Sequence, residues 1–393
     1  MTEIKAPAPS ALEDIPDGEA ARIENIVSLT LDQLKQRYAG KPAIRRGVHP
    51  KDHGCVIAKF TILDSIPNEL QVGLFSKPGH QYDALIRFSN AEVNADKPDS
   101  DFEVGEITRT DKITHGSRGM AVKVMRVTGS PLQTANLVTT RDPLNQDFLM
   151  INQPVFAFAN VVDYEALSEV LLQHKDEAKP FFLRTTSEDN EIKKRAFTTA
   201  GIVKRIASND FPTKSDDFPP AFQSPPVSPL DNRYFSAAAF LFGEGRAMKF
   251  SARPVAPASD KVTDISDPIY LRTALKKRLA AAGGEGIEFD FQVQVRKAES
   301  LAGKIAEEIE DVCFLWREED YPFETVAKIS IPPQDQDIDS DERRALCEGL
   351  TFSPWNGLAE HRPLGGINRL RRAVYEASAR IRHVPGGCPW DGG

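Results

Sequence analysis

The residues best suited to chemistry lie near the C-terminus, where one tyrosine stands among several arginines. Arg371 and Tyr375 are four positions apart, and Arg382 is seven positions beyond Tyr375, so a helix would place all three on one face. A phenol normally ionises near pH 10, and fixed cations within roughly 4–6 Å favour its charged form. A phenolate is a hard anionic ligand suited to ferric iron, and tyrosine is a known axial ligand of haem. The alternative is a basic surface helix with Tyr375 half-buried.

Two further segments contain groups that such a site would need. His49 lies just before a predicted strand and could transfer protons near neutral pH, although a loop histidine can also be merely solvated. In the next segment, Arg87 and Ser89 share the strand face opposite to Phe88. If that face is the barrel interior, Arg87 needs an anionic partner, because burial of an unpaired arginine is costly. The alternative is that this polar face simply lies outside.

A third segment places Asn152 in an apolar run with Met150, Phe156 and Phe158. An amide there could hydrogen-bond a small ligand, or it could be a turn asparagine that precedes a proline. A fourth segment, 350–358, leads directly toward the helix that carries the tyrosine.

Composition restricts the class of protein. The chain has 393 residues, 40% hydrophobic and 27% charged, which is typical of a globular protein. Its net charge of −8 argues against a nucleic-acid surface. No stretch approaches 18 uninterrupted apolar residues, so we expect no membrane span. The N-terminal region lacks the basic and apolar parts of a secretory signal, so we expect a cytoplasmic protein.

The cysteines are consistent with that localisation. The chain has four, scattered and without a CxxC pair: Cys55, Cys313, Cys347 and Cys388. This pattern suits a reducing compartment and supports neither a zinc site nor a disulfide framework.

Hydrophobic periodicity predicts an α+β fold. Helical patterns cover 22–38, 164–175 and 190–207, and a proline-rich crossing segment covers 212–229. Strand-like runs occur at 55–63, 71–75, 84–88, 119–126, 234–242, 248–253, 287–295 and 325–331. Eight strands in two groups separated by helices predict a closed eight-stranded antiparallel β-barrel with helices in the crossovers. We expect a polar lead and helix over 1–40, one barrel domain over 41–385 and a short tail over 386–393.

Seven segments in colinear order resemble the catalase family. They are Arg46 to His49, Arg87-Phe88-Ser89, Arg118 to Val124, Asn152 to Phe156, Asp320-Tyr321-Pro322, Phe352 to Asn356, and Arg371 with Tyr375 and Arg382. The family has similar motifs in the same order, from its distal histidine to its proximal tyrosine.

The resemblance implies a haem enzyme with a C-terminal helix on the proximal side of the haem. It implies one non-covalent haem b with Tyr375 as axial ligand of ferric iron, and the CxxCH motif for covalent attachment is absent. Other implied haem contacts are Arg46, Arg87, Arg371, Arg382 and Phe156. The implied catalytic groups are His49 as proton shuttle, Ser89 orienting its ring, and Asn152 hydrogen-bonding the peroxide.

The sequence also departs from the family. Residues 376–380 read Glu-Ala-Ser-Ala-Arg, where the family usually has Pro-Asp-Thr-His-Arg. The chain ends about ten residues after His383, without the helical C-terminal extension, and has no histidine-rich segment around 231–234, so NADPH is not expected. We therefore expect a core-only relative with a wider channel mouth.

The expected substrates are hydrogen peroxide or organic and lipid hydroperoxides, with a small organic reductant as a possible partner. Catalase and peroxidase turnover would both pass through an oxidised haem. Two alternatives stay open: a fatty-acid hydroperoxide isomerase or lyase of the allene-oxide-synthase type, and a non-catalytic haem or lipid binder. The sequence leaves the oligomeric state open, a homo-oligomer included.

Overall fold

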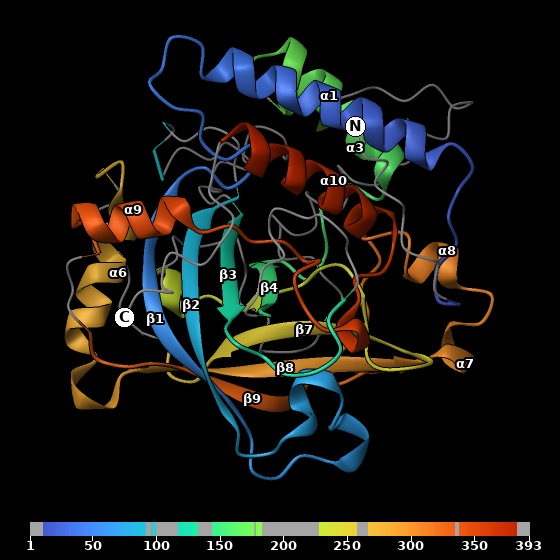
Figure 1. Cartoon of the computed structure of the whole chain (residues 1–393), viewed down its shortest axis with the longest axis vertical. Coiled ribbons are helices and arrows are strands. Elements are labelled where there is room, and N and C mark those ends of the chain that lie inside the picture. The colour runs from blue at the N-terminus through green and yellow to red at the C-terminus, as the bar shows by residue number, and fades with distance from the viewer. Residues whose placement is uncertain are drawn as a thin grey trace.

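Eight strands close into an antiparallel barrel, as predicted (Figure 1). The computed structural model describes residues 11–91, 96, 98–99, 117–132, 144–176, 178–182, 228–257, 266–334 and 338–382. The strand order is β5-β4-β3-β2-β1-β9-β8-β7, and β5 pairs with β7 to complete the ring. A further strand, β6, pairs with the same edge of β7. The strands are β1 (Asp52–Ile62), β2 (Gln81–Asn90), β3 (Arg118–Val124), β4 (Gln146–Ile151), β5 (Tyr234–Phe235), β6 (Phe240–Leu241), β7 (Arg246–Pro254), β8 (Ile287–Lys297) and β9 (Glu324–Ile331).

The barrel interior is a packed aromatic core. Phe148 contacts three other rings, those of Phe60, Phe250 and Phe291, with centroid separations of 4.6 to 5.9 Å. Strand alternation places Phe88 in this core. Arg87 and Ser89 therefore point to the outer face of β2, which means that any ligand site they form lies outside the barrel wall.

Three helices stack over that outer face (Figure 1). α10 (Gly366–Ile381) lies nearest the barrel, and α1 (Glu19–Arg37) and α3 (Val161–Gln173) cover it. The other helices are α4 (Lys179–Phe182), α6 (Tyr270–Ala281), α7 (Ala298–Leu301), α8 (Ile305–Glu308) and α9 (Asp341–Gly349). Short 3₁₀ turns are η1 (Asn68–Leu70), η2 (Gly73–Ser76), η3 (Pro229–Asp231), η4 (Gly283–Glu285) and η5 (Ala359–His361).

The interface of these three helices is apolar at its centre and charged at one end. Ile26, Val161, Leu370 and Val374 form one buried cluster. At its edge, Arg369 of α10 binds three carboxylates, those of Glu13, Glu19 and Glu310, with N–O distances of 2.6 to 2.9 Å. This arginine thus fixes α10 to the segment that precedes α1.

Some predicted elements are wrong. The predicted strand 71–75 is not a strand, and its residues 73–75 belong to the 3₁₀ turn η2. Gly73 has φ 53°, and the N–H of Leu74 donates to His361 Nε2 rather than to a neighbouring strand. The eighth barrel strand is β4, which the periodicity did not reveal. The predicted strand 234–242 is divided into β5 and β6, because Ala237 between them has φ 57°.

The prediction that the cysteines form no disulfide is also wrong, because Cys55 and Cys347 are joined. The predicted helix 190–207, most of the proline-rich segment 212–229 and the tail 386–393 lie outside the described residues. Among the helices that the structure describes, none is long and apolar enough to cross a membrane.

Candidate active site

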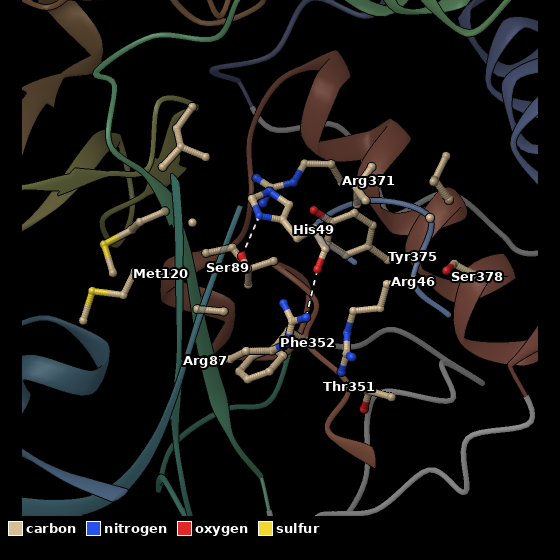
Figure 2. Close-up of a pocket in the computed structure, with 18 of the residues that line it drawn as sticks. Arg46, His49, Arg87, Ser89, Met120, Thr351, Phe352, Arg371, Tyr375 and Ser378 are labelled. Atoms are coloured by element: carbon tan, nitrogen blue, oxygen red, sulfur yellow. Dashed lines mark hydrogen bonds between the residues drawn. The ribbon is translucent and has the colours of Figure 1, made fainter. Parts of the chain in front are cut away.

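A cavity lies between the outer face of the barrel and α10 (Figure 2). The space inside its envelope, open solvent included, is about 890 Å³. Its lining includes eight of the nine residues that the sequence singled out: Arg46, His49, Arg87, Ser89, Phe156, Arg371, Tyr375 and Arg382. These eight residues come from four of the seven motifs, and the lining also includes Gly119 and Phe352 from two others.

α10 provides one wall with helical regularity. Its lining residues fall at positions 371, 374, 375, 378, 379 and 382, the spacing of a single helix face. Gly365 has φ 84° and permits the sharp turn into the helix. The Arg371 guanidinium carbon lies 5.5 Å from the centre of the Tyr375 ring and 5.9 Å from that of Phe156. A cation and a phenol thus share this wall.

The opposite wall carries His49 and Ser89. His49 Nδ1 and Ser89 Oγ are hydrogen-bonded at 2.9 Å (Figure 2). The backbone of His49 has φ 54°, a strained conformation for a non-glycine residue. Its carbonyl accepts a hydrogen bond from Arg87 Nη2 at 2.9 Å. The hydrogen bond with Ser89 therefore orients the His49 ring, and the hydrogen bond from Arg87 fixes the backbone of the loop.

Gly119 of β3 provides the space for the His49 ring. A methyl group at this position would lie 2.6 Å from His49 Cε1, closer still to Nδ1, and 2.8 Å from Ser89 Oγ. Real side chains do not approach so closely, so only glycine fits beside this pair. Gly119 lies within the Arg118–Val124 motif, but this role was not predicted from the sequence. The signal that could have found it is an isolated glycine in a strand pattern, which indicates that another group approaches the backbone closely.

His49 is a neutral base in this setting. Burial first, and then the nearby cations of Arg87, Arg371 and Arg46, together lower the pKa of its imidazole to about 3. The ring is therefore uncharged at neutral pH. Because Nδ1 is bonded to Ser89, Nε2 is the nitrogen free to exchange a proton with a ligand.

One end of the cavity holds three buried arginines, Arg46, Arg87 and Arg382, here named the arginine cluster. Burial first, and then repulsion by Arg46, lower the pKa of Arg87 to about 9 and that of Arg382 to about 10. Arg87 Nε and Arg382 Nη1 are buried without a hydrogen-bond partner among the described residues. Such groups favour an anionic ligand, because uncompensated buried charge is costly.

Glu348 is the carboxylate nearest to the arginine cluster. Its Oε2 lies 2.8 Å from Arg46 Nη1, and its Oε1 lies 3.9 Å from Arg382 Nη1. Its side chain is 42% exposed, so it offsets the charge of the arginine cluster only in part. No pattern in the sequence marked Glu348.

The remaining walls are apolar. They include Ile151, Phe156, Phe352 and Val374. The Phe156 ring is stacked on Phe158 at 5.3 Å, which holds it from behind, while Phe158 itself does not line the cavity. This lining complements a ligand that has an apolar body and acidic groups at one end.

Asn152 is the predicted site residue that does not line this cavity. Its Oδ1 accepts the backbone N–H of Arg118 at 2.7 Å, and its own N–H donates to the Arg118 carbonyl at 3.0 Å. Its side-chain oxygen thus joins the end of β3 to the end of β4. Its neighbours Met150 and Ile151 line the cavity instead.

The closed barrel with a helix across its outer face defines a catalase-like fold. A fungal catalase matches the chain with a TM-score of 0.57, and catalase A from Saccharomyces cerevisiae with 0.58, each at 16% identity. Both alignments cover 90% of this chain, but only 64% and 66% of those catalases, so the chain spans about two thirds of their length. No family model and no curated protein matches the sequence. At this identity, the similarity establishes the fold alone.

Proposed function

We propose that the chain binds haem b in this cavity and acts as a hydroperoxide-consuming oxidoreductase of the catalase or peroxidase type. The observation that carries the proposal is the composition of a single cavity. It combines a tyrosine beside a cation, a neutral histidine on the opposite wall, and at one end a cluster of arginines in which Arg87 Nε and Arg382 Nη1 have no hydrogen-bond partner among the described residues. A flat apolar group with two carboxylates and a ferric ion requires this combination.

The residues present fit the group. Tyr375 would hold the iron, with Arg371 as the cation that favours its phenolate form. The arginine cluster would bind the propionates, because the guanidinium fork matches a carboxylate. The apolar walls would contact the macrocycle. When bound, haem iron supplies the redox chemistry that cleavage of an O–O bond requires.

The protein's own part is proton transfer and positioning. His49 Nε2 would accept the proton of a bound hydroperoxide and return it to the departing oxygen, a general acid–base role. Ser89 keeps the ring in place through Nδ1. Carboxylates bound by the arginine cluster would reduce the positive field at His49 and raise its pKa toward neutrality, which would make it a better base.

The apolar lining near Phe156 and Ile151 would accommodate the alkyl part of an organic hydroperoxide as well as hydrogen peroxide. We expect measurable turnover of cumene hydroperoxide alongside oxygen release from hydrogen peroxide. Comparison of kcat/KM for the two substrates tests this. Activity on hydrogen peroxide alone, at the speed of an ordinary catalase, would contradict it.

Substitution of the axial tyrosine tests haem binding. Tyr375→Phe should abolish the charge-transfer bands of ferric haem–phenolate or greatly reduce haem retention, and Tyr164→Phe is the matched control. Tyr164 is a neighbouring tyrosine of α3 in the same apolar cluster, but it does not line the cavity. A Tyr375→Phe protein with an unchanged visible spectrum would exclude Tyr375 as the ligand.

Substitution of the histidine tests the chemistry. His49→Ala should retain haem but react with peroxide at least about 100-fold more slowly in stopped-flow spectra, the lower range for general acid–base catalysis. A variant that reacts at the wild-type rate would exclude this role. Rearranged products from linoleate hydroperoxide without a reductant would favour an isomerase, and haem binding without turnover would favour a binding protein.

A further inference from the structure

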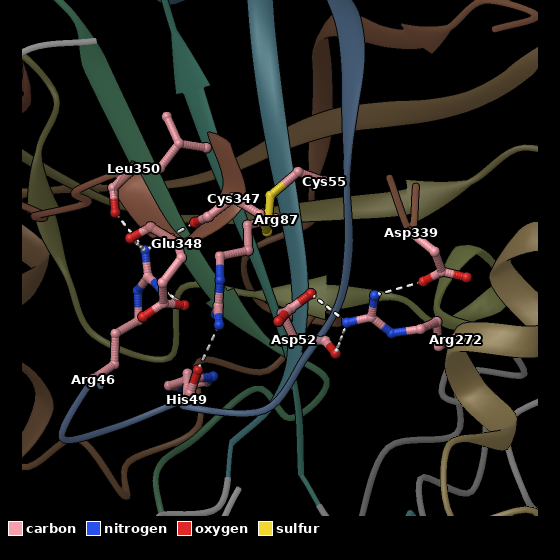
Figure 3. The surroundings of a disulfide bond; sticks show 10 residues. All are labelled: Arg46, His49, Asp52, Cys55, Arg87, Arg272, Asp339, Cys347, Glu348 and Leu350. Atoms are coloured by element: carbon pink, nitrogen blue, oxygen red, sulfur yellow. Dashed lines mark hydrogen bonds and ion pairs between the residues drawn. A yellow bond between two sulfur atoms is a disulfide. The ribbon is translucent and has the colours of Figure 1, made fainter. Parts of the chain in front are cut away.

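The Cys55–Cys347 disulfide joins α9 to β1 beside the arginine cluster (Figure 3). The two Cα atoms are 5.6 Å apart, the usual distance for this bond. Of the nine residues of α9, all of which the structure describes, Cys347 alone is buried. The crosslink therefore accounts for much of the attachment of this surface helix to the barrel.

The two ends of α9 are attached to β1 in different ways. Just before the helix, Asp339 pairs with Arg272 at 2.9 Å, and Arg272 pairs with Asp52 at the start of β1 at 2.6 Å (Figure 3). At the other end, the attachments are the disulfide and the small buried cluster that Cys347 and Leu350 form with Cys55 and Leu85. Reduction would leave the first anchor intact, so movement would be confined to the C-terminal end of the helix.

That C-terminal end binds Arg46. The carbonyls of Cys347 and Glu348 accept hydrogen bonds from Arg46 Nη2 at 3.1 and 3.3 Å, and the carbonyl of Leu350 accepts another. The Glu348 carboxylate binds Arg46 Nη1. The position of this guanidinium in the cavity therefore depends on residues that the disulfide anchors.

We propose that the Cys55–Cys347 pair is a redox-dependent clamp on the arginine cluster. In the disulfide form, the end of α9 holds Arg46 where it can bind a carboxylate of the ligand. In the dithiol form, that end is released, Arg46 loses its fixed partners, and the ligand binds more weakly.

The oxidant that forms the disulfide would be the hydroperoxide substrate, so this step rests on the proposed function. Two thiols and one hydroperoxide give the disulfide, an alcohol and water, or two waters from hydrogen peroxide. Each sulfur loses one electron, and the cleaved O–O bond takes up both electrons and both thiol protons. Disulfides of cytosolic proteins are usually transient or redox-sensing, so the expected cytoplasmic localisation favours this role. The protein would then bind its cofactor most tightly when its substrate is present.

Arginine labelling tests the clamp without any ligand. Phenylglyoxal and mass spectrometry should find Arg46 protected in the disulfide form and labelled after treatment with TCEP. Arg369, whose three carboxylate partners are remote from the disulfide, should be equally protected in both forms. Cys347→Ser should show the labelled pattern without reductant, and Cys313→Ser should behave like the wild type. Equal protection of Arg46 in both forms would overturn the proposal.

Haem titration tests the consequence for the cavity. Soret titration with hemin should give a dissociation constant that is roughly tenfold weaker after reduction, equivalent to about 1.4 kcal/mol. Hemin dimethyl ester, which lacks free carboxylates, should bind equally in both forms. If hemin binds in neither form, the proposed function fails, while the labelling result still decides the clamp. If hemin binds equally in both forms, the clamp fails and the proposed function stands.

Discussion

A single methyl group added at position 119 tests the packing of the cavity wall that carries His49 and Ser89. In Gly119→Ala, the new Cβ would lie 2.6 Å from His49 Cε1 and 2.8 Å from Ser89 Oγ. The backbone of Gly119 is ordinary strand, paired with Ser89 on one side and Ile151 on the other, so alanine imposes no backbone strain there. The cost is therefore steric. Overpacking of this kind typically destabilises a protein by about 1–3 kcal/mol.

The same displacement should impair the site. A ring pushed away from Ser89 no longer presents Nε2 to the ligand, so we expect peroxide turnover of the haem-loaded variant to fall by at least about 100-fold. Urea denaturation measures the stability change, and stopped-flow absorbance measures the turnover. Ala121→Gly is a matched control, because position 121 lies on the same strand and also lines the cavity.

A double-mutant cycle shows whether the His49 ring causes the destabilisation by Gly119→Ala. In a His49→Ala background the ring is absent, so Gly119→Ala should lose most of its cost, which gives a coupling energy of about 1–3 kcal/mol between two residues in contact. The Ser89 hydroxyl remains and accounts for any residual cost. Equal destabilisation in the two backgrounds would refute the reasoning, because it would show that the His49 ring does not occupy the space beside Gly119.

Two further predictions concern stability. Burial lowers the pKa of His49 to about 3 and those of His53 and His361 to about 4, so the unfolded chain binds protons below about pH 6.5 that the folded chain excludes. The stability that these neutral histidines contribute should be fully present above pH 6.5, and the free energy of unfolding should fall by about 4 kcal/mol per pH unit near pH 5, from three protons. Urea denaturation at pH 7 and pH 5 measures this fall, and His361→Gln should remove about a third of the slope. A free energy of unfolding that does not change with pH would contradict the burial of the three rings. Arg369→Met should cost about 3–5 kcal/mol, because it removes the cation that pairs with the buried carboxylates of Glu19 and Glu310. Lys328→Met, which breaks an exposed pair, should cost less than about 1 kcal/mol. Equal costs in denaturant melts would show that the Arg369 network does not secure α10.

The fold was predictable wherever one side of a strand faces the barrel core. The run 287–295 alternates clearly because its apolar residues enter the aromatic interior and its polar residues do not. β4 was missed because it begins with Gln146 and Asp147, two polar residues that are nevertheless buried. Asp147 is matched by Lys123 on the neighbouring strand at 2.7 Å, a partner that no local pattern reveals.

The candidate site was also predictable only where its residues are close in sequence. The face formed by Arg371, Tyr375 and Arg382 was predictable because helical spacing is local. The partners of the arginine cluster were not, since Glu348 reaches Arg46 across about 300 positions of sequence. The disulfide was missed for the same reason, because spacing alone does not bring two distant cysteines together.

Barrel closure has a consequence for how the protein is made. β1 pairs with β9 from Lys59 to Ile62, so its second edge stays without a partner until residues 327–330 have been synthesised. Those residues follow β1 by about 270 positions, which take roughly 15–55 s at about 5–20 residues per second. For that time a long strand with buried apolar side chains would present an open edge, the feature that promotes aggregation. Newly made chains should therefore depend on chaperones during synthesis, even though the finished barrel closes its ring and pairs the C-terminal part of β1 on both sides.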